Sequence, residues 1–584
     1  MSYSHLETFP PKLPGRDYLY QPFSQEEWNK SSFATEQEMQ WFTDARYGMF
    51  IHFGLSTYKN ADLSWDVCST RKAPDFGSGP VPDEEWTSWP EHFELENFDA
   101  KHYVELAKLS GFKYVVLITK HHDGYHMWDT EESEFKITNT PFGRDLVKEI
   151  IDACHEQGMP VGLYYSQRDW HHPDYMPVDP NKVEAQTGVN WTLKEGFDSP
   201  IGDNHWKYLA YQERAVRELC TRYGKIDVFW WDALWWGGMF TADMWDGEHI
   251  NNIIRELQPG IIINNRCSIP GDFDTPEKRL GAFQNWRAWE SCVCLSDSWS
   301  YSGTKIKPLK DIVAMLTMTI CGDGNLLMSL GPQWNGEFNK NEVDALTEMG
   351  KWLDKHSEAV YSTRGGPWKT NTWGGSVYRG HEVYLHIISL VDQVLELPKL
   401  PNCKVLSATI YGRNCDVLVE ETETVLKFHI PKDIQSEPST IVRLKLDKEV
   451  SSIAPIDSGE PSSFMDICAY GCEYQGEYSL LDGRCEHSGQ SFITISFGES
   501  IRLTAVALGL EEEANEQEIV LYTSENGEHW TDWGIVDTNR YEVEITCYEA
   551  GAWIPGNDVK YVKLQSKTSE SESLKLSSFK CFSR

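Results

Sequence analysis

The sequence lacks the features of a membrane protein or of a secreted precursor. No stretch of the 584 residues approaches the ~20 consecutive apolar residues that a membrane-spanning helix needs. The amino terminus, MSYSHLETFPPKLPGRDYLY, has no basic start followed by an apolar run, so no signal peptide is visible. We therefore expect a cytoplasmic protein, or a secreted or periplasmic one if a leader has been trimmed.

Clustered cysteine is also missing. The 14 cysteines are scattered, and the closest groups, Cys292/Cys294 and Cys468/Cys472/Cys485, lack the paired C-x-x-C spacing of a zinc site. Their density is too low for a small disulfide scaffold. Free thiols in a reducing compartment are the expectation, and the sequence predicts no metal and no other cofactor.

Positive charge is scarce. The chain has 53 Lys+Arg against 89 Asp+Glu, a formal net charge of −36. Such a surface repels phosphate backbones and anionic lipids, which argues against nucleic acid and membranes as partners and favours a neutral substrate. A homo-oligomer is compatible with it. The aromatic content is high, at 13% with 24 tryptophans, and tryptophan faces are common walls for sugar rings.

The length and the 40% hydrophobic content predict two to four globular domains after an N-terminal extension, 1–37. Over 38–360, strand-like runs alternate with amphipathic helical segments. The expected strands are 47–54, 112–119, 159–166, 226–232, 261–266 and 325–332, and the aromatic run NWRAW, 285–289, reads as a further one. This alternation predicts an α/β fold of the (β/α)₈-barrel type. The alternative, a doubly wound sheet, lacks the glycine-rich phosphate loop after its first strand.

Beyond residue 360 the helical pattern ends. Short alternating runs predict a β-sandwich over 361–455 and, after the linker-like PIDSGEPSS, a second β-sandwich over 456–584. In the second one, QSFITISFG and IRLTAVALGL read as two strands, and SENG before HWTDW is typical of a tight hairpin turn.

Polar residues at the carboxyl ends of barrel strands line a single face, which is where barrel enzymes place their active sites. Residues at or beyond these ends are His52, His121, His122, Tyr164, Trp230, Asp232, Arg266, Glu277, Glu290 and Trp299. Each alone has an ordinary structural explanation, such as a core histidine, an ion-pair partner or a helix start. Their convergence on one rim favours a catalytic site.

Three chemistries compete for this rim. A metal-dependent hydrolase would use His121/His122 and His171/His172, but adjacent pairs lack the spacing that directs two rings at one ion. A serine hydrolase would need a G-x-S-x-G elbow, which is absent. A glycosidase needs two carboxylates, hydroxyl-binding groups and an aromatic wall, and all are present. A sugar-binding protein without activity would need the carboxylates to be lost.

Five motifs make the interpretation specific. WFTDARYGMFIHFGLSTY, GFKYVVLITKHHDGYHMW, VGLYYSQRDW, IDVFWWD and GNLLMSLGP resemble the successive barrel motifs of the retaining α-L-fucosidases of glycoside hydrolase family 29, in order over 38–360. The following β-sandwich fits that family, and the final domain resembles a discoidin-type (F5/8 C) sugar-binding module. The resemblance implies exo-hydrolysis of terminal α-L-fucosyl linkages of an oligosaccharide or glycoconjugate, with retention. A related sugar such as an α-L-galactoside is the alternative.

The resemblance also assigns roles. Asp232, at the end of the fourth strand, is the implied nucleophile. The implied contacts of the fucose ring are His52, His121, His122, Tyr164, Trp230 and Arg266, with Glu85 and Trp86 of the EEW motif as further ones. The TPE motif points to Glu277 as the acid/base, with Glu290 of WESC as its rival. Trp299 of WSY falls on the aglycone side.

Overall fold

The computed structural model describes residues 25–456 apart from 62, 69–79, 176–204, 233–244, 268, 277–282, 286, 297, 304, 372, 389, 391–392 and 414, then residue 458 and the strands and hairpin within 472–583. A parallel sheet forms its centre, in the order β7-β6-β5-β4-β1-β9-β8. Its strands are β1 (Tyr47–Ile51), β4 (Tyr114–Lys120), β5 (Val161–Ser166), β6 (Val228–Asp232), β7 (Ile262–Ile263), β8 (Glu290–Cys294) and β9 (Asn325–Leu330).

The two edges of this sheet are bridged by single residue pairs. Asn264, directly after β7, pairs in parallel with Phe273, and Asp274 pairs in parallel with Trp289, directly before β8. Phe273 and Asp274 thus occupy the eighth strand position, and the sheet curls into a barrel. The predicted (β/α)₈-type fold is confirmed.

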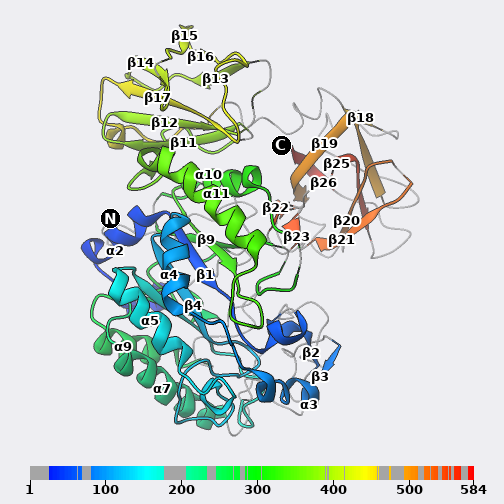
Figure 1. The fold of residues 1–584 in the computed structure, drawn as a ribbon. Helices are drawn as coiled ribbons and strands as arrows, with labels where there is room; N and C mark the ends of the chain where they lie inside the picture. Colours follow the sequence, from blue (N-terminus) through cyan, green and yellow to red (C-terminus); the bar gives the residue numbers. More distant parts are fainter. Residues whose placement is uncertain are drawn as a thin grey trace.

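Helices cover the outside of the barrel (Figure 1). They are α2 (Glu36–Ala45), α4 (Ala100–Leu109), α5 (Leu146–Gln157), α7 (His205–Arg222), α9 (Gly247–Leu257), α10 (Leu309–Cys321) and α11 (Lys340–His356), with short helices α1 (Gln25–Lys30) and α3 (Asp83–Trp86). The sequence fixes their ends by local chemistry. For example, the Asp145 side chain accepts a hydrogen bond from the Lys148 amide at the start of α5, and Gly158 ends this helix in the left-handed region at φ 66°.

The barrel strands alternate between two apolar clusters. Phe50, Tyr114, Tyr164 and Trp230 belong to a cluster inside the barrel, whereas neighbouring residues such as Trp231 pack against the outer helices. One strand differs from the sequence-based expectation. The run 285–289 reads as a strand that ends before Glu290, but β8 begins at Glu290. That residue therefore lies at the amino-terminal end of its strand, away from the catalytic rim.

Two antiparallel sheets follow the barrel, in the orders β10-β11-β12-β17-β14 and β13-β16-β15. Their strands are β10 (Arg364–Gly365), β11 (Gly374–Arg379), β12 (Glu382–Ile387), β13 (Val394–Pro398), β14 (Val405–Ile410), β15 (Leu418–Glu421), β16 (Val425–His429) and β17 (Thr440–Leu446). They share one apolar core, and α10 contacts β10 and β11 (Figure 1). This is the predicted β-sandwich.

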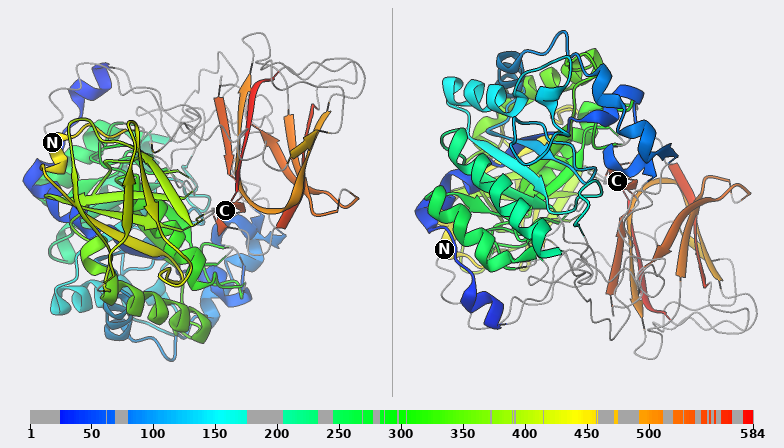
Figure 2. Two further views of the ribbon diagram at one scale, coloured as in Figure 1. Left: turned by 90° about the horizontal axis from the view of Figure 1, so that it is seen from above. Right: turned by 90° about the horizontal axis from the view of Figure 1, so that it is seen from below.

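The last strands form a separate antiparallel body beside the barrel (Figure 2). They include β18 (Cys472–Tyr474), β19 (Phe492–Leu510), β20 (Ile519–Ser524), β21 (Thr531–Val536), β22 (Glu542–Thr546), β25 (Asp558–Ser566) and β26 (Leu576–Ser583). β20 and β21 form the predicted hairpin. The two runs expected as separate strands over 490–510 form a single strand, β19. Its first half pairs with β25, and its second half pairs with β22 and β26.

The helices of the described part of the chain are all too short or too polar to span a bilayer.

Candidate active site

Asp232 is the last residue of β6, at the carboxyl-terminal rim of the barrel. Its side chain is 13% exposed, so it is largely shielded but still reachable. One carboxylate oxygen accepts a hydrogen bond from the Tyr164 hydroxyl at 2.6 Å, and the other accepts one from Arg266 Nη1 at 2.9 Å. These two contacts offset the cost of removing the charge from water and fix the direction in which the carboxylate points.

Arg266 is held from several sides. Its Nε donates to Thr275 Oγ1 at 2.9 Å and Nη2 donates to the Thr275 carbonyl at 3.2 Å. Its guanidinium carbon lies 4.6 Å from the centre of the Trp230 ring, a cation–π contact. The Trp230 ring also stacks on Tyr164, with centroids 5.6 Å apart. Trp230 is therefore packed against both groups that hold Asp232.

Three histidines lie at this rim, and a serine holds each of them. His122 Nε2 is 3.8 Å from an Asp232 oxygen, the His121 ring lies next to His122, and the His52 ring lies 6.0 Å from the Tyr164 ring. His52 Nδ1 lies 2.7 Å from Ser329 Oγ, and both His121 Nδ1 and His122 Nδ1 lie 2.6 Å from a serine oxygen, of Ser64 and Ser166 respectively. These serines cannot be recognised from the sequence as histidine partners. Ser166 and Ser329 lie within the VGLYYSQRDW and GNLLMSLGP motifs, but each serine is 44 or more residues away from its histidine, so the sequence does not show which ring it meets.

The serine partners set which nitrogen carries the proton. The Ser166 and Ser329 hydroxyls donate to the backbone carbonyls of Arg168 and Trp299, so His122 and His52 donate through Nδ1 and keep Nε2 as an acceptor. Ser64 Oγ accepts from the Asp123 amide, and its hydrogen is left for His121 Nδ1.

All three rings are neutral near pH 7. Burial lowers the pKa of His121 to about 3, and burial together with the neighbouring His121 holds the pKa values of His52 and His122 well below the ordinary value. Neutral imidazoles with defined donors and acceptors suit the hydroxyl groups of an uncharged sugar.

The remaining predicted residues lie at different depths. The half-buried Trp299 ring is 5.2 Å from the His52 ring, which places it at the same rim. Trp86 is buried against Trp89, and its Nε1 donates to Asp123 at 3.1 Å, so it contacts the loop after His122 rather than Asp232. Glu85, on the short helix α3, is exposed.

The two candidate proton donors are placed differently. Glu277 lies outside the described residues, two positions after Thr275, the residue that binds Arg266. Glu290 is 1% exposed inside the barrel, where it accepts hydrogen bonds from Tyr114 and Trp230. Burial raises the pKa of Glu290 to about 7. Its place at the amino-terminal end of β8, beneath Trp230, does not suit a group that must reach a glycosidic oxygen.

A metal ion is a further use for some of these groups. Each of His121, His122 and Asp232 offers one ligand atom, and the three atoms lie within 4.8 Å of one another. However, the Asp232 carboxylate already has the Arg266 guanidinium at 2.9 Å, and a divalent cation beside it would be repelled. Nε2 of His121 carries the proton and is not a ligand. The donor set fits a guanidinium-held carboxylate better than a metal.

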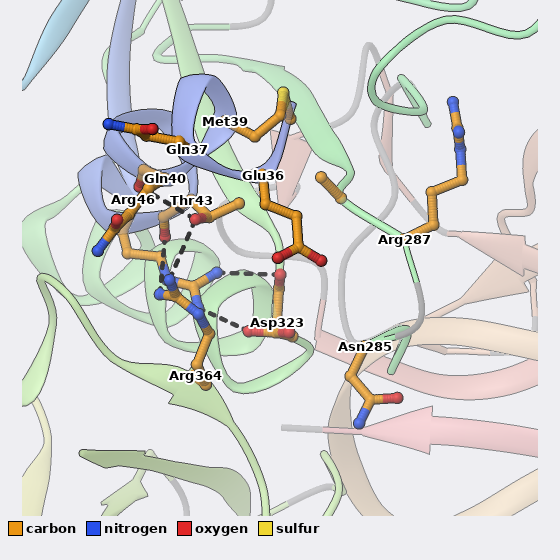
Figure 3. A pocket seen from close by; sticks show the side chains of 11 residues that line it. Glu36, Gln37, Met39, Gln40, Thr43, Arg46, Asn285, Arg287, Asp323 and Arg364 are labelled. Carbon is orange, nitrogen blue, oxygen red and sulfur yellow. Dashed lines mark hydrogen bonds and ion pairs between the residues drawn. The ribbon is translucent and has the colours of Figure 1, made fainter. Parts of the chain in front are cut away.

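A separate pocket of about 430 Å³ is lined by residues of α2 and of the segments that precede β8 and β9 (Figure 3). Arg46 donates to Asp323 at 2.6 Å inside it, and Arg364 pairs with Asp44 at 2.8 Å. These ion pairs connect three parts of the chain: the end of α2, the turn before β9, and β10. Arg46 and Asp323 precede the barrel strands β1 and β9, whereas Asp232 lies at the far end of its strand, so this pocket is distinct from the rim that holds Asp232.

The arrangement at the rim supports substitution at a sugar carbon. A carboxylate oriented by two donors is a suitable nucleophile for a carbon that develops positive charge, and the aromatic rings and neutral histidines form a pocket for a ring with hydroxyl groups. The chemistry requires a second carboxyl group on the other face of the sugar.

Comparisons with known proteins agree with this chemistry. Residues 20–358 match the family model described as Alpha-L-fucosidase. An alpha-L-fucosidase of Dictyostelium discoideum is 26% identical over 382 residues, which cover 58% of this chain and 76% of that protein.

Two crystal structures are also similar. Alpha-L-fucosidase isoenzyme 1 from Paenibacillus thiaminolyticus superimposes with a TM-score of 0.60 and 31% identity, over 71% of this chain and 99% of that one. A family 29 alpha-L-fucosidase from Bacteroides thetaiotaomicron, trapped as a covalent intermediate with 2-fluoro-fucosyl fluoride, gives a TM-score of 0.59 and 25% identity over 71% and 97% of the two chains.

Proposed function

The chain belongs to the α-L-fucosidase family, and from this premise we propose that it removes terminal α-L-fucose from fucosylated oligosaccharides or glycoconjugates with retention of configuration. The protein is a glycoside hydrolase. The observation that carries the proposal is the Asp232 carboxylate, held at the rim by Tyr164 and Arg266 beside the neutral His121 and His122.

The first step forms a fucosyl ester on the enzyme. An oxygen of Asp232 attacks the anomeric carbon, the bond from that carbon to the aglycone oxygen breaks, and the acid/base residue gives its proton to the departing oxygen. We assign this proton donor to Glu277. Tyr164 and Arg266 keep the attacking oxygen in line as positive charge develops on the sugar.

The second step releases fucose. Water attacks the anomeric carbon from the face that the aglycone has left, the acid/base residue takes one proton from the water, and the ester bond to Asp232 breaks. Two inversions at one carbon return the α configuration. The covalent intermediate trapped in the Bacteroides relative supports this course for a family member.

We expect proton NMR of an early reaction mixture to show α-L-fucose as the first product from an aryl α-L-fucoside. Two displacements must retain the configuration, whereas direct attack by water would give the β anomer first. Initial β-fucose, or the absence of turnover with every fucoside tried, would overturn the proposal. A chelator serves as the control for a metal-dependent hydrolase, because it should leave the rate unchanged.

The sugar can be distinguished from its nearest relative in the same assay. L-Galactose differs from L-fucose by one hydroxyl group at C6, and an apolar pocket rejects such an addition only weakly. A matched aryl α-L-galactoside should therefore react, but with a lower kcat/KM than the fucoside. The reverse order would change the substrate to galactoside and leave the retaining mechanism in place.

We propose that the strands after residue 458 form a sugar-binding module of the discoidin type that assists binding to extended glycans. They form their own antiparallel body, and the Paenibacillus structure is matched over 99% of its length by only 71% of this chain. This coverage supports a body that is additional to the fold shared with that family member.

We expect a shortened protein that ends at Ser458 to keep kcat/KM on an aryl fucoside within about a factor of two, because domains with separate cores fold independently. The cut follows Ser458 because the Ile456 amide donates to Pro367 and Trp373 Nε1 donates to Ser458 in the first sandwich. On an extended fucosylated glycan, KM should rise. Complete loss of aryl fucoside activity in a shortened protein with native circular dichroism would contradict this role.

A further inference from the structure

The buried carboxyl group of Glu290 is not used by the reaction described above. It starts β8, pairs with Asn325 at the start of β9, and its side chain is enclosed at 1% exposure. The carboxylate accepts one hydrogen bond from the Tyr114 hydroxyl and one from Trp230 Nε1, the latter at 2.9 Å. A carboxyl group inside an apolar barrel is costly to fold unless such partners are present.

The barrel makes room for this contact. Gly48 on β1 faces the Tyr114 ring, and a Cβ atom at residue 48 would lie 2.3 Å from the ring carbon that bears the hydroxyl. A side chain there would displace the ring. The glycine therefore allows the tyrosine to lie across the interior and to place its hydroxyl group on Glu290.

Trp230 connects this buried carboxyl group to the catalytic rim. Its indole N–H is fixed by Glu290, while its ring lies against the Arg266 guanidinium at 4.6 Å and the Tyr164 ring at 5.6 Å. Arg266 and Tyr164 are the two donors to Asp232. A rotation of the indole would therefore move both groups that orient the nucleophile.

We propose that Glu290 is a positioning residue for the nucleophile, which acts through the Trp230 indole on the two donors that hold Asp232. The inference rests on the proposed function, because it assigns the nucleophile to Asp232. Glu290 itself does not touch the substrate, since the Trp230 ring lies between it and the rim. Its role differs from proton donation, and the two roles predict different kinetics.

Two substitutions at residue 290 separate the hydrogen bond from the space it fills. Glu290→Gln keeps an oxygen that accepts from Trp230 Nε1, whereas Glu290→Leu keeps a similar volume and leaves the indole N–H without its acceptor. We expect Glu290→Leu to lower kcat/KM on aryl fucosides by roughly 10- to 100-fold, the effect of a displaced reacting group. Glu290→Gln should stay within about threefold of the wild type, because the amide oxygen still accepts from the indole N–H and keeps Trp230 in place.

The kinetic pattern distinguishes positioning from proton donation. A displaced nucleophile slows its attack on good and poor leaving groups alike, so the loss in Glu290→Leu should be the same for dinitrophenyl and nitrophenyl fucosides. Most of it should appear in kcat rather than KM. Azide should not restore the rate, because no space opens beside the anomeric carbon. A proton donor would show a strong dependence on the leaving group and would yield α-fucosyl azide.

A double-mutant cycle tests the path through the indole. In a Trp230→Phe background the N–H is absent, so Glu290→Leu should cost little further activity. Glu342→Leu is the matched control. Glu342 is also a buried glutamate, but it accepts from the Asn339 amide at the start of α11, so its loss should lower stability without changing kcat. Should Glu290→Leu fail to fold, the comparison of Glu290→Gln with Trp230→Phe tests the same bond.

Turnover by the wild type separates a failure of the proposed function from a failure of the positioning role. If the wild type cleaves no fucoside, the proposed function fails. If it does, the positioning role is overturned by an unchanged kcat in Glu290→Leu, by fully additive losses in the cycle, or by an α-fucosyl azide product. Equal losses for both leaving groups together with near-wild-type Glu290→Gln would support it.

Discussion

Replacement of Asp232 by glycine should lower kcat on an aryl fucoside by about three orders of magnitude or more, because no covalent intermediate can form without the nucleophile. The fold should survive, since Asp232 is partly exposed and lies at the end of β6. Activity is measured with a nitrophenyl fucoside, and folding by circular dichroism and thermal unfolding. A glycine variant with wild-type kcat would rule out Asp232 as the nucleophile.

Azide gives this variant a distinctive product. The small anion can enter the space left by the carboxylate, where Arg266 and Tyr164 lie within reach of its charge, and attack the anomeric carbon from that face. A single displacement inverts the configuration, so the product should be β-fucosyl azide. The matched control is Asp227→Gly. Asp227 precedes β6 at the opposite end of the barrel and caps the Val161 amide, so azide should not affect that variant.

The position of Asp232 could be predicted from the sequence because its signal is local. A buried apolar strand, DVFWW, is followed directly by this carboxylate, and the order of the other strand-like runs makes that strand end part of a barrel rim. Its proposed role as nucleophile comes from the family resemblance. The supports of Asp232 are partly local as well, since Tyr164 lies near the end of β5 and Arg266 follows β7. Sequence order cannot show that both of them donate to the same carboxylate.

The histidine supports could not be predicted. Ser329 is 277 residues away from His52, and Ser64 is 57 away from His121. Serine is common, has no strong pattern of its own, and becomes informative only when the fold brings it to a ring nitrogen. The same applies to the direction of each hydrogen bond, which depends on whether a backbone carbonyl takes the serine proton.

The place of Glu290 shows a different limit of prediction from sequence, which is the position of a strand along the chain. Aromatic residues in NWRAW are typical of a strand, yet these residues precede β8, where Trp289 Nε1 donates to the Gln284 carbonyl and Arg287 pairs with Asp274. The true strand, ESCVC, consists largely of small residues. A shift of five residues moves Glu290 from one end of the barrel to the other, which changes its interpretation from acid/base candidate to buried support.

The assignment of the acid/base to Glu277 predicts a loss that depends on the leaving group. Glu277→Ala should nearly abolish cleavage of natural fucosides, whose alkoxide leaving groups need a proton, by about 10²–10⁴-fold. A dinitrophenyl fucoside, whose phenolate leaves unaided, should still form the ester with Asp232. The second step should then be slow, because no group takes the proton from water, and the covalent intermediate should accumulate and be detectable by mass spectrometry.

The azide product distinguishes Glu277 from the other two carboxylates, Asp232 and Glu290. In Glu277→Ala it should attack the fucosyl ester from the face that the aglycone left, which gives the α-fucosyl azide, the opposite anomer to the Asp232→Gly product. The position of Thr275 supports this assignment, since Arg266 bonds both to Thr275, two residues before Glu277, and to Asp232. Glu290→Ala is the comparison. Because Glu290 lies beneath Trp230, that variant should lose activity equally on good and poor leaving groups and give no α-azide. If Glu290→Ala shows the leaving-group dependence and Glu277→Ala does not, the proton donor is Glu290.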